Sequence, residues 1–128
     1  MEIFKIVTLA LSGLLLLLVG AMRLSNPIKT YLKSSGITIN NDVDLLNEVR
    51  GISAVQLLGG IIILLGIFFP NLTVISFAAA ALIFLGFAVG RLLSMAIDGK
   101  PNKQIVQGVI FELVLGAASA FCLASALV

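Results

Sequence analysis

The chain has 128 residues, of which 60% are hydrophobic and 11% are charged, and its formal net charge is +2. Its mean hydropathy of +1.21 is too high for a soluble domain of this length and predicts an integral membrane protein. The chain contains no histidine and a single cysteine, Cys122. This excludes a disulfide framework within the chain and the usual zinc and haem sites. We therefore expect no metal ion and no cofactor, and no basic, aromatic-interleaved surface indicates a nucleic-acid partner.

Four apolar stretches reach the ~17–25 residues that a helix needs to cross a bilayer. They lie near residues 4–22, 51–69, 73–97 and 105–127. The first follows Lys5 as a secretory signal would, but it exceeds the ~7–15 residues of a signal core, so we expect a retained helix. The connections after the second and third stretches are short, which suits antiparallel neighbours. The sequence therefore predicts an all-α, antiparallel four-helix membrane bundle that forms a single domain of residues 1–128.

The connection after the first span, residues 26–47, contains a predicted short helix. Asn26 and Pro27 form a typical N-cap followed by proline at the first helical position. Tyr31 then lies on an apolar face opposite Lys29 and Lys33, an arrangement that suits a membrane surface. We predict an interfacial helix that residues 34–36 end, and a solvated loop is the alternative interpretation.

The second span is expected to begin before its apolar stretch. Asn40 and Asn41 are candidates for its cap, because Asp42 and Asp44 would then lie in the first turn and favour the helix dipole. The amphipathic extension that results would carry Leu45, Leu46 and Val49 on its apolar face.

Two ionisable residues lie inside otherwise apolar spans, Arg91 in the third and Glu112 in the fourth. A charge in hydrocarbon costs roughly 2.5–3.5 kcal/mol on insertion scales, so such residues are usually paired, hydrated or functional. Counted from Asp98 and Gln104 at 1.5 Å per residue, both charges lie roughly 10–12 Å from the same membrane surface. An Arg91–Glu112 ion pair between neighbouring helices is therefore expected to be available.

Small residues form stripes on three spans, which would let helices approach closely. On the fourth span the stripe comprises Gln104, Gly108, Glu112, Gly116 and Ser119. On the second span it comprises Asn47, Arg50, Gly51, Ala54 and Leu58, with Gln56, Gly59 and Gly60 beside it, and on the third span Gly86 and Gly90 precede Arg91. We interpret these glycines first as packing positions and second as the lining of a ligand site.

Nearly all charged residues fall at one end of the predicted bundle, which favours a polar vestibule closed by the apolar half. The candidate ligand-binding residues are Glu48, Arg50, Arg91, Asp98 and Glu112. Three roles stay open for them. Arg91 and Glu112 could form a structural ion pair, Arg50 and Arg91 could bind an anion or headgroup, and Glu112 could handle protons.

The lysine and arginine distribution predicts the orientation in the membrane. Seven of the eight such residues flank the two longer connections, and only Lys5 lies toward the other surface. The positive-inside rule then puts both connections in the cytoplasm and both termini outside. If several of these charges serve a site instead, the orientation would be inverted.

Three segments, NEVRGISAVQLLGG, FLGFAVGRLLSMAIDGKPNKQ and VIFELVLG, resemble a family of small bacterial four-helix membrane proteins known only as a domain of unknown function. The resemblance is carried by Asn47, Glu48, Arg50, Gly51, Gly90, Arg91, Asp98, Gly99, Pro101 and Glu112. The architecture is more distantly similar to DoxX-like proteins, some of which are linked to quinone-dependent electron transfer. The resemblance implies a multi-pass protein of the bacterial inner membrane and names no reaction.

Two classes of function are compatible with these features. The favoured one is a module that binds a lipid, a quinone or another amphiphile, or that serves as a subunit of a membrane complex. The alternative is a small integral-membrane enzyme or proton-coupled transporter that uses Glu112 with Arg50 and Arg91. The expected partners are membrane lipids, an amphiphilic ligand, and a second copy of the chain or another membrane protein.

Overall fold

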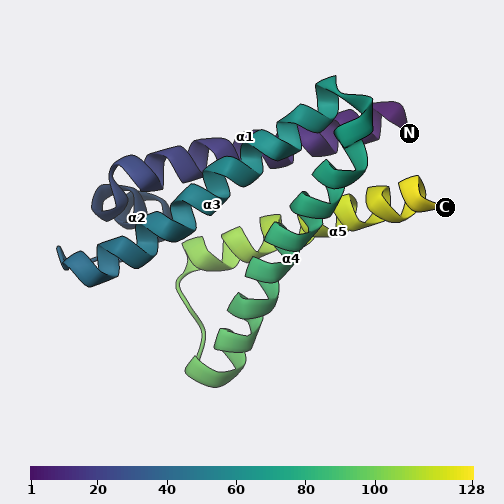
Figure 1. The fold of residues 1–128 in the computed structure, drawn as a ribbon. Helices are drawn as coiled ribbons and strands as arrows, with labels where there is room; N and C mark the ends of the chain where they lie inside the picture. The colour runs from purple at the N-terminus through teal and green to yellow at the C-terminus, as the bar shows by residue number, and fades with distance from the viewer.

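Figure 1 shows the computed structural model, which describes residues 1–128. Its elements are α1 (Glu2–Ser25), α2 (Pro27–Ser35), α3 (Val43–Phe68), the 3₁₀ turn η1 (Pro70–Leu72), α4 (Thr73–Asp98) and α5 (Lys103–Leu127). The helices α1, α3, α4 and α5 are long and apolar enough to cross a membrane. The chain is a multi-pass, all-α membrane protein, which confirms the predicted fold class.

The four long helices form two antiparallel pairs. α1 packs along α3 and α4 packs along α5, and these two interfaces are more extensive than any contact between the pairs. In Figure 1 the pairs are joined where η1 links α3 to α4, and they spread apart toward the connection between α4 and α5. Both termini lie at the joined end. The spread end therefore carries α2 and the α4–α5 connection.

Apolar side chains from all four long helices form the core. The buried cluster consists of Leu9, Leu16, Ile63, Phe77, Ala80, Phe84 and Cys122. Cys122 is a free, fully buried thiol in this cluster and packs as a small apolar side chain. The core thus fixes how the α1–α3 pair meets the α4–α5 pair.

Glycines bring the backbones of α1 and α3 unusually close. A Cβ on Gly60 would lie 2.6 Å from the backbone nitrogen of Leu17 and 2.8 Å from the carbonyl oxygen of Gly13. A Cβ on Gly20 would lie 2.5 Å from the backbone nitrogen of Leu57. Gly60 is therefore a packing position, as predicted, while the contribution of α1 was not predicted.

The predicted small-residue stripe on the second span is wrong as a packing face. The side chains that α3 buries are Val49, Ser53, Gln56, Gly59, Gly60, Ile63 and Gly66. Gly51 has no atom within 4 Å of where its Cβ would be, and Arg50 and Leu58 are exposed. Gly51 lies nine residues before Gly60, about two and a half turns, so the two glycines point to opposite sides of α3. Gly86 and Gly90 on α4 also make no close approach.

The caps of α2 follow the sequence prediction, whereas the cap of α3 does not. Asn26 Oδ1 accepts a hydrogen bond from the backbone N–H of Lys29 at 3.4 Å, and Gly36 ends α2 with a φ of 66°. The N-cap of α3 is Asp42, whose carboxylate accepts from the backbone N–H of Asp44 at 3.0 Å. The prediction of Asn40 or Asn41 was wrong, because a carboxylate satisfies the first N–H groups and also complements the helix dipole.

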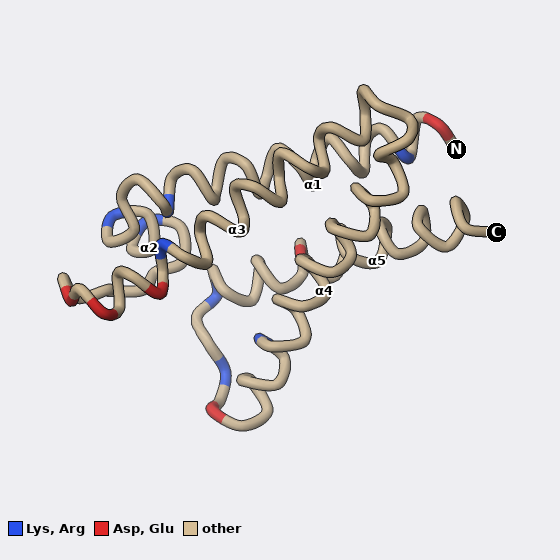
Figure 2. Tube along the Cα trace, viewed as in Figure 1, with Lys and Arg blue, Asp and Glu red and all other residues tan.

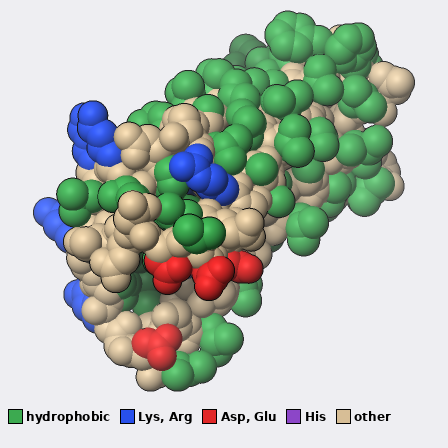
Figure 3. Space-filling view, turned by 60° about the vertical axis from the view of Figure 1, so that its left-hand side comes forward, with side chains coloured by type: hydrophobic (Ala, Val, Ile, Leu, Met, Phe, Trp, Pro, Cys, Tyr) green, Lys and Arg blue, Asp and Glu red, His purple; other side chains and the backbone are tan.

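Charged residues gather at the spread end of the molecule. Figure 2 shows them there and along the neighbouring turns, with Glu2 and Lys5 at the opposite end. Figure 3 shows a nearly continuous apolar surface over the half that carries the joined end. An apolar surface of this extent is expected to face lipid. The spread end therefore lies toward one membrane surface, and which surface that is stays a prediction.

Candidate functional site

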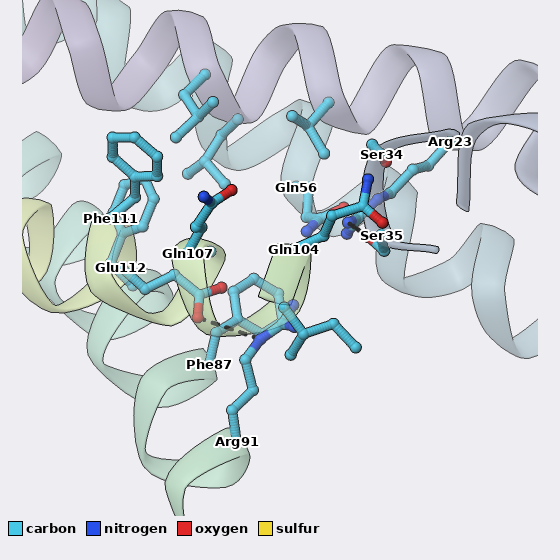
Figure 4. Close-up of a pocket in the computed structure, with 16 residues that line it drawn as sticks. Arg23, Ser34, Ser35, Gln56, Phe87, Arg91, Gln104, Gln107, Phe111 and Glu112 are labelled. Atoms are coloured by element: carbon cyan, nitrogen blue, oxygen red, sulfur yellow. Dashed lines mark hydrogen bonds and ion pairs between the residues drawn. The ribbon is translucent and has the colours of Figure 1, made fainter. Parts of the chain in front are cut away.

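A cavity of about 320 Å³ lies between the two helix pairs near their spread end, and Figure 4 shows the side chains around it. Its apolar wall consists of Leu15, Leu16, Val19, Phe84, Phe87, Ile105 and Phe111. Its polar wall consists of Arg23, Ser34, Ser35, Gln56, Arg91, Gln104, Gln107 and Glu112, and Gly108 completes the lining. The cavity is amphiphilic, and its size falls at the lower end of the roughly 300–1,000 Å³ of small-molecule sites.

Arg91 of α4 and Glu112 of α5 form the one ion pair of the structure. Arg91 Nε lies 3.1 Å from Glu112 Oε1, and the guanidinium also lies 6.0 Å from the ring centroid of Phe87. The side chain of Arg91 is 30% exposed and that of Glu112 is 12% exposed. The two residues lie together across the α4–α5 interface, as their similar predicted depths in the membrane had indicated.

Arg23, in the last turn of α1, is the second arginine of the cavity. It is only 8% exposed, it forms no ion pair, and Nη2 donates to Ser35 Oγ at 3.3 Å. Its guanidinium lies 4.3 Å from the ring centroid of Tyr31, a cation–π distance. Thus α2 places a hydroxyl and an aromatic face against Arg23, and neither of them carries a countercharge.

Three buried polar atoms of the cavity have no hydrogen-bond partner in the protein. They are Arg23 Nε, Gln56 Oε1 and Glu112 Oε1, the last of which lies within ion-pair distance of Arg91 but not in hydrogen-bond geometry. Gln56 is 3% exposed and is the contribution of α3 to the polar wall. Buried polar atoms are nearly always hydrogen-bonded in native structures. Two further unpartnered atoms, Ser12 Oγ and Ser119 Oγ, lie outside this lining, so Arg23 Nε and Gln56 Oε1 are the two cavity atoms that have neither a hydrogen bond nor an ion pair.

The end of α2 is fastened over the cavity by the start of α5. Asn102 Nδ2 donates to the carbonyl oxygen of Ser35 at 2.9 Å, and Gln104 Nε2 donates to that of Lys33 at 3.2 Å. Asn102 is also the N-cap of α5, since its Oδ1 accepts from the backbone N–H of Ile105 at 2.9 Å. These bonds satisfy carbonyls at the end of α2 that have no partner within the helix.

Replacing Asn102 tests how firmly α2 is held. Asn102→Ala removes both the α5 cap and the bond to Ser35, and we expect the free energy of unfolding to fall by about 1–2 kcal/mol. The measurement is SDS titration of the purified protein followed by circular dichroism. Asn71→Ala, at an exposed position in η1, is the control and should change the midpoint little. Equal effects of the two substitutions would contradict the fastening role.

Three of the predicted site residues lie outside the cavity. Arg50 Nη1 donates to the carbonyl oxygen of Leu24, so this arginine completes the C-terminal turn of α1. Glu48 is exposed near the start of α3. Asp98 is exposed at the end of α4, where its carboxylate accepts from Ser94 Oγ at 2.9 Å. The structure thus brings together Arg91 and Glu112 but not Arg50 with Arg91.

Sequence reasoning did not assign Arg23 to the site. It counted Arg23 as a charge flanking the first connection and as an arginine that could serve a site, but left it out of the candidate ligand-binding set. Leu9, Leu16 and Arg23 recur at intervals of seven residues. Residues seven apart share a helix face, and the first two are core leucines, so this spacing could have placed Arg23 on the buried face of α1. For Ser34 and Ser35 no comparable signal exists, because the position of α2 depends on tertiary contacts.

The sequence was also compared with known proteins. The model of the family described as "Domain of unknown function (DUF4345)" matches residues 3–123. This match confirms the resemblance to an uncharacterised family over nearly the whole chain. No curated protein and no solved structure matches the chain.

Proposed function

Because the chain belongs to the DUF4345 family, whose description names no activity, we propose a function from its cavity. The protein is a non-enzymatic membrane module that binds an amphiphile, such as a lipid or a quinone, between its two helix pairs. The polar head lies against the wall that contains Arg23, Gln56 and the Arg91–Glu112 pair, and the apolar part lies along α1, α4 and α5. The observation that carries this proposal is the set of unpartnered buried polar atoms in a cavity that apolar side chains also line.

The depth of the cavity supports an occupant from the membrane. On α5 the lining begins with Gln104 in the first turn and continues to Glu112, eight residues or roughly 12 Å further along the helix. On α1 it extends from Arg23 at the helix end to Leu15, a similar depth. An amphiphile already present in the bilayer could therefore keep its head near the charged end and its tail at hydrocarbon level.

The same proposal includes a location. We place the protein in a bacterial inner membrane with both termini outside, so that the spread end opens toward the cytoplasm. This orientation is supported by the distribution of lysine and arginine. Seven of the eight such residues lie toward the spread end, and only Lys5 lies toward the joined end. In this orientation the cavity receives its occupant from the inner leaflet.

A substitution that fills the cavity tests the proposal. Gly108 lines the cavity, and no atom lies within 4 Å of where its Cβ would be, so Gly108→Phe is expected to place a bulky side chain at the lining. Native mass spectrometry of the gently solubilised protein, with extraction of bound molecules, should detect an amphiphile on the wild type. We expect its dissociation constant to rise about tenfold in Gly108→Phe, the change that corresponds to about 1.4 kcal/mol of binding, and lower occupancy is the readout.

The matched control is Gly86→Phe. Gly86 also has open space at its Cβ but lies on the exposed side of α4, away from the cavity lining. This control should retain the bound molecule at the wild-type level. Equal occupancy in Gly108→Phe and wild type, or no amphiphile on the wild type at any detergent concentration that keeps it folded, would contradict the proposal.

A further inference from the structure

We infer that the occupant of this cavity carries one net negative charge and that Arg23 binds it. The chemical class is an oxyanion head, a carboxylate or a phosphodiester, on an apolar tail. This inference rests on the proposed function, because it specifies the head of the proposed amphiphile. Arg23, the residue that carries it, is absent from the ligand-binding set derived from the sequence.

The charges of the cavity wall give the first argument. Arg23, Arg91 and Glu112 are the only charged residues in the lining, so the wall carries one positive charge in excess. Arg91 and Glu112 lie within ion-pair distance and neutralise each other, which assigns the excess charge to Arg23. A guanidinium that is 92% covered by protein interacts strongly with any neighbouring charge, because water screens it little.

The second argument is the way in which Arg23 is held. Tyr31 lies against the face of its guanidinium, and Ser35 accepts from Nη2, so both fix the plane of the fork. Nε of Arg23 remains without an acceptor. A guanidinium fixed in this way is suited to an oxyanion, which accepts two parallel hydrogen bonds from an arginine fork. Figure 4 shows Arg23 and Ser35 at one end of the cavity and the Arg91–Glu112 pair further along it.

Neutral and zwitterionic heads fit this wall less well. A zwitterion such as a phosphocholine needs an anionic partner for its cation, but the single carboxylate of the cavity is already paired with Arg91. A neutral head leaves Arg23 without a countercharge. A doubly charged phosphomonoester brings one negative charge too many for the single excess positive charge. The wall is therefore complementary to a monoanion.

The test is lipid titration of the delipidated protein by native mass spectrometry. Phosphatidylglycerol and oleate are the monoanionic probes, phosphatidylcholine is the zwitterionic probe, and phosphatidate is the phosphomonoester, whose second ionisation gives it more negative charge than a phosphodiester as the pH rises. We expect wild type to bind the monoanions about tenfold more tightly than phosphatidylcholine, the gain typical of one charge-assisted hydrogen bond. Inorganic phosphate, a free anion without a tail, should compete only weakly.

Two variants change the charge of the wall in known directions, and a third keeps it. Arg23→Gln should remove the preference for monoanions over phosphatidylcholine, and Arg23→Lys, which keeps the charge, should restore part of it. Glu112→Gln raises the excess to two positive charges and should shift the preference toward phosphatidate. Lys29→Gln is the control. It removes a positive charge at an exposed position of α2 outside the cavity, and it should leave every lipid preference unchanged.

The outcomes separate this inference from the proposed function. If all lipids bind equally and Gly108→Phe still blocks them, the amphiphile site stands and the charge inference is overturned. If no lipid binds, or if inorganic phosphate binds as tightly as phosphatidylglycerol, the proposed function fails as well. If Arg23→Gln does not fold, the lipid preference of Glu112→Gln tests the charge inference instead. A shift from the monoanions toward phosphatidate would support the inference, and an unchanged preference would overturn it, because loss of a purely structural carboxylate changes stability alone.

Discussion

Arg91→Ala is expected to lower the free energy of unfolding by about 2–3 kcal/mol, somewhat less than the 3–5 kcal/mol typical when one partner of a fully buried pair is removed. The loss comes from Glu112, whose side chain is 12% exposed and would remain as a carboxylate without its countercharge. The effect is smaller than the full range because the Arg91 side chain is 30% exposed, so the ion pair is only partly buried. SDS titration of the purified protein measures the change.

The double variant Arg91→Ala with Glu112→Ala separates a structural pair from two independent effects. If the pair locks α4 to α5, the double variant should be more stable than Arg91→Ala alone, because no uncompensated charge remains. Glu112→Gln is the gentler control, since it keeps the shape of the side chain. Additive losses in the double variant, or a loss below about 0.5 kcal/mol in Arg91→Ala, would instead describe a solvent-screened pair of little energetic weight.

The fold was predictable because the membrane limits the solutions. Each long apolar stretch must be a helix when no water is present to satisfy its backbone, so composition and length were sufficient for α1, α3, α4 and α5. The cap of α2 at Asn26 was also predictable, because it depends on neighbouring residues alone. The rotation of α3 within the apolar part was not predictable. From Gly51 to Phe68 every residue except Gln56 is apolar or small, so this part of the sequence contains little that distinguishes the face toward α1 from the face toward lipid.

The site was predicted in part for a related reason. Arg91 and Glu112 stand out as charges in apolar spans, and the short α4–α5 connection makes their helices neighbours. Arg50 lies near the same end of the bundle, but it donates a hydrogen bond to the carbonyl oxygen of Leu24 at the end of α1. No local sequence pattern indicates this contact. The spacing from Leu9 and Leu16 places Arg23 on the buried face of α1, but its contacts with Tyr31 and Ser35 depend on where α2 lies, which no spacing in the sequence indicates. Contacts made by a connection that folds back over the helices cannot be predicted from the periodicity of the sequence.

Gly60→Ala is expected to cause a loss of stability of about 3 kcal/mol or more, at the upper end of what one added carbon costs in a packed interface. The new Cβ would lie 2.6 Å from the backbone nitrogen of Leu17 and 2.8 Å from the carbonyl oxygen of Gly13. Both contacts are with backbone, which cannot rotate away as a side chain can, so α1 and α3 must separate. Their separation would also displace Leu16 and Arg23 from the cavity wall, and binding of the amphiphile should weaken together with stability.

Gly90→Ala makes the same chemical change where α4 has open space, and it is the matched control for Gly60→Ala. Here the only expected effect is the better helix propensity of alanine, which raises stability by up to about 1 kcal/mol in a water-exposed helix and less in lipid. SDS titration followed by circular dichroism measures both variants under one condition. The opposite signs follow from one geometric difference, whether backbone lies within reach of the new carbon. If Gly60→Ala is tolerated as well as Gly90→Ala, the close approach of α1 and α3 does not hold the first helix pair together.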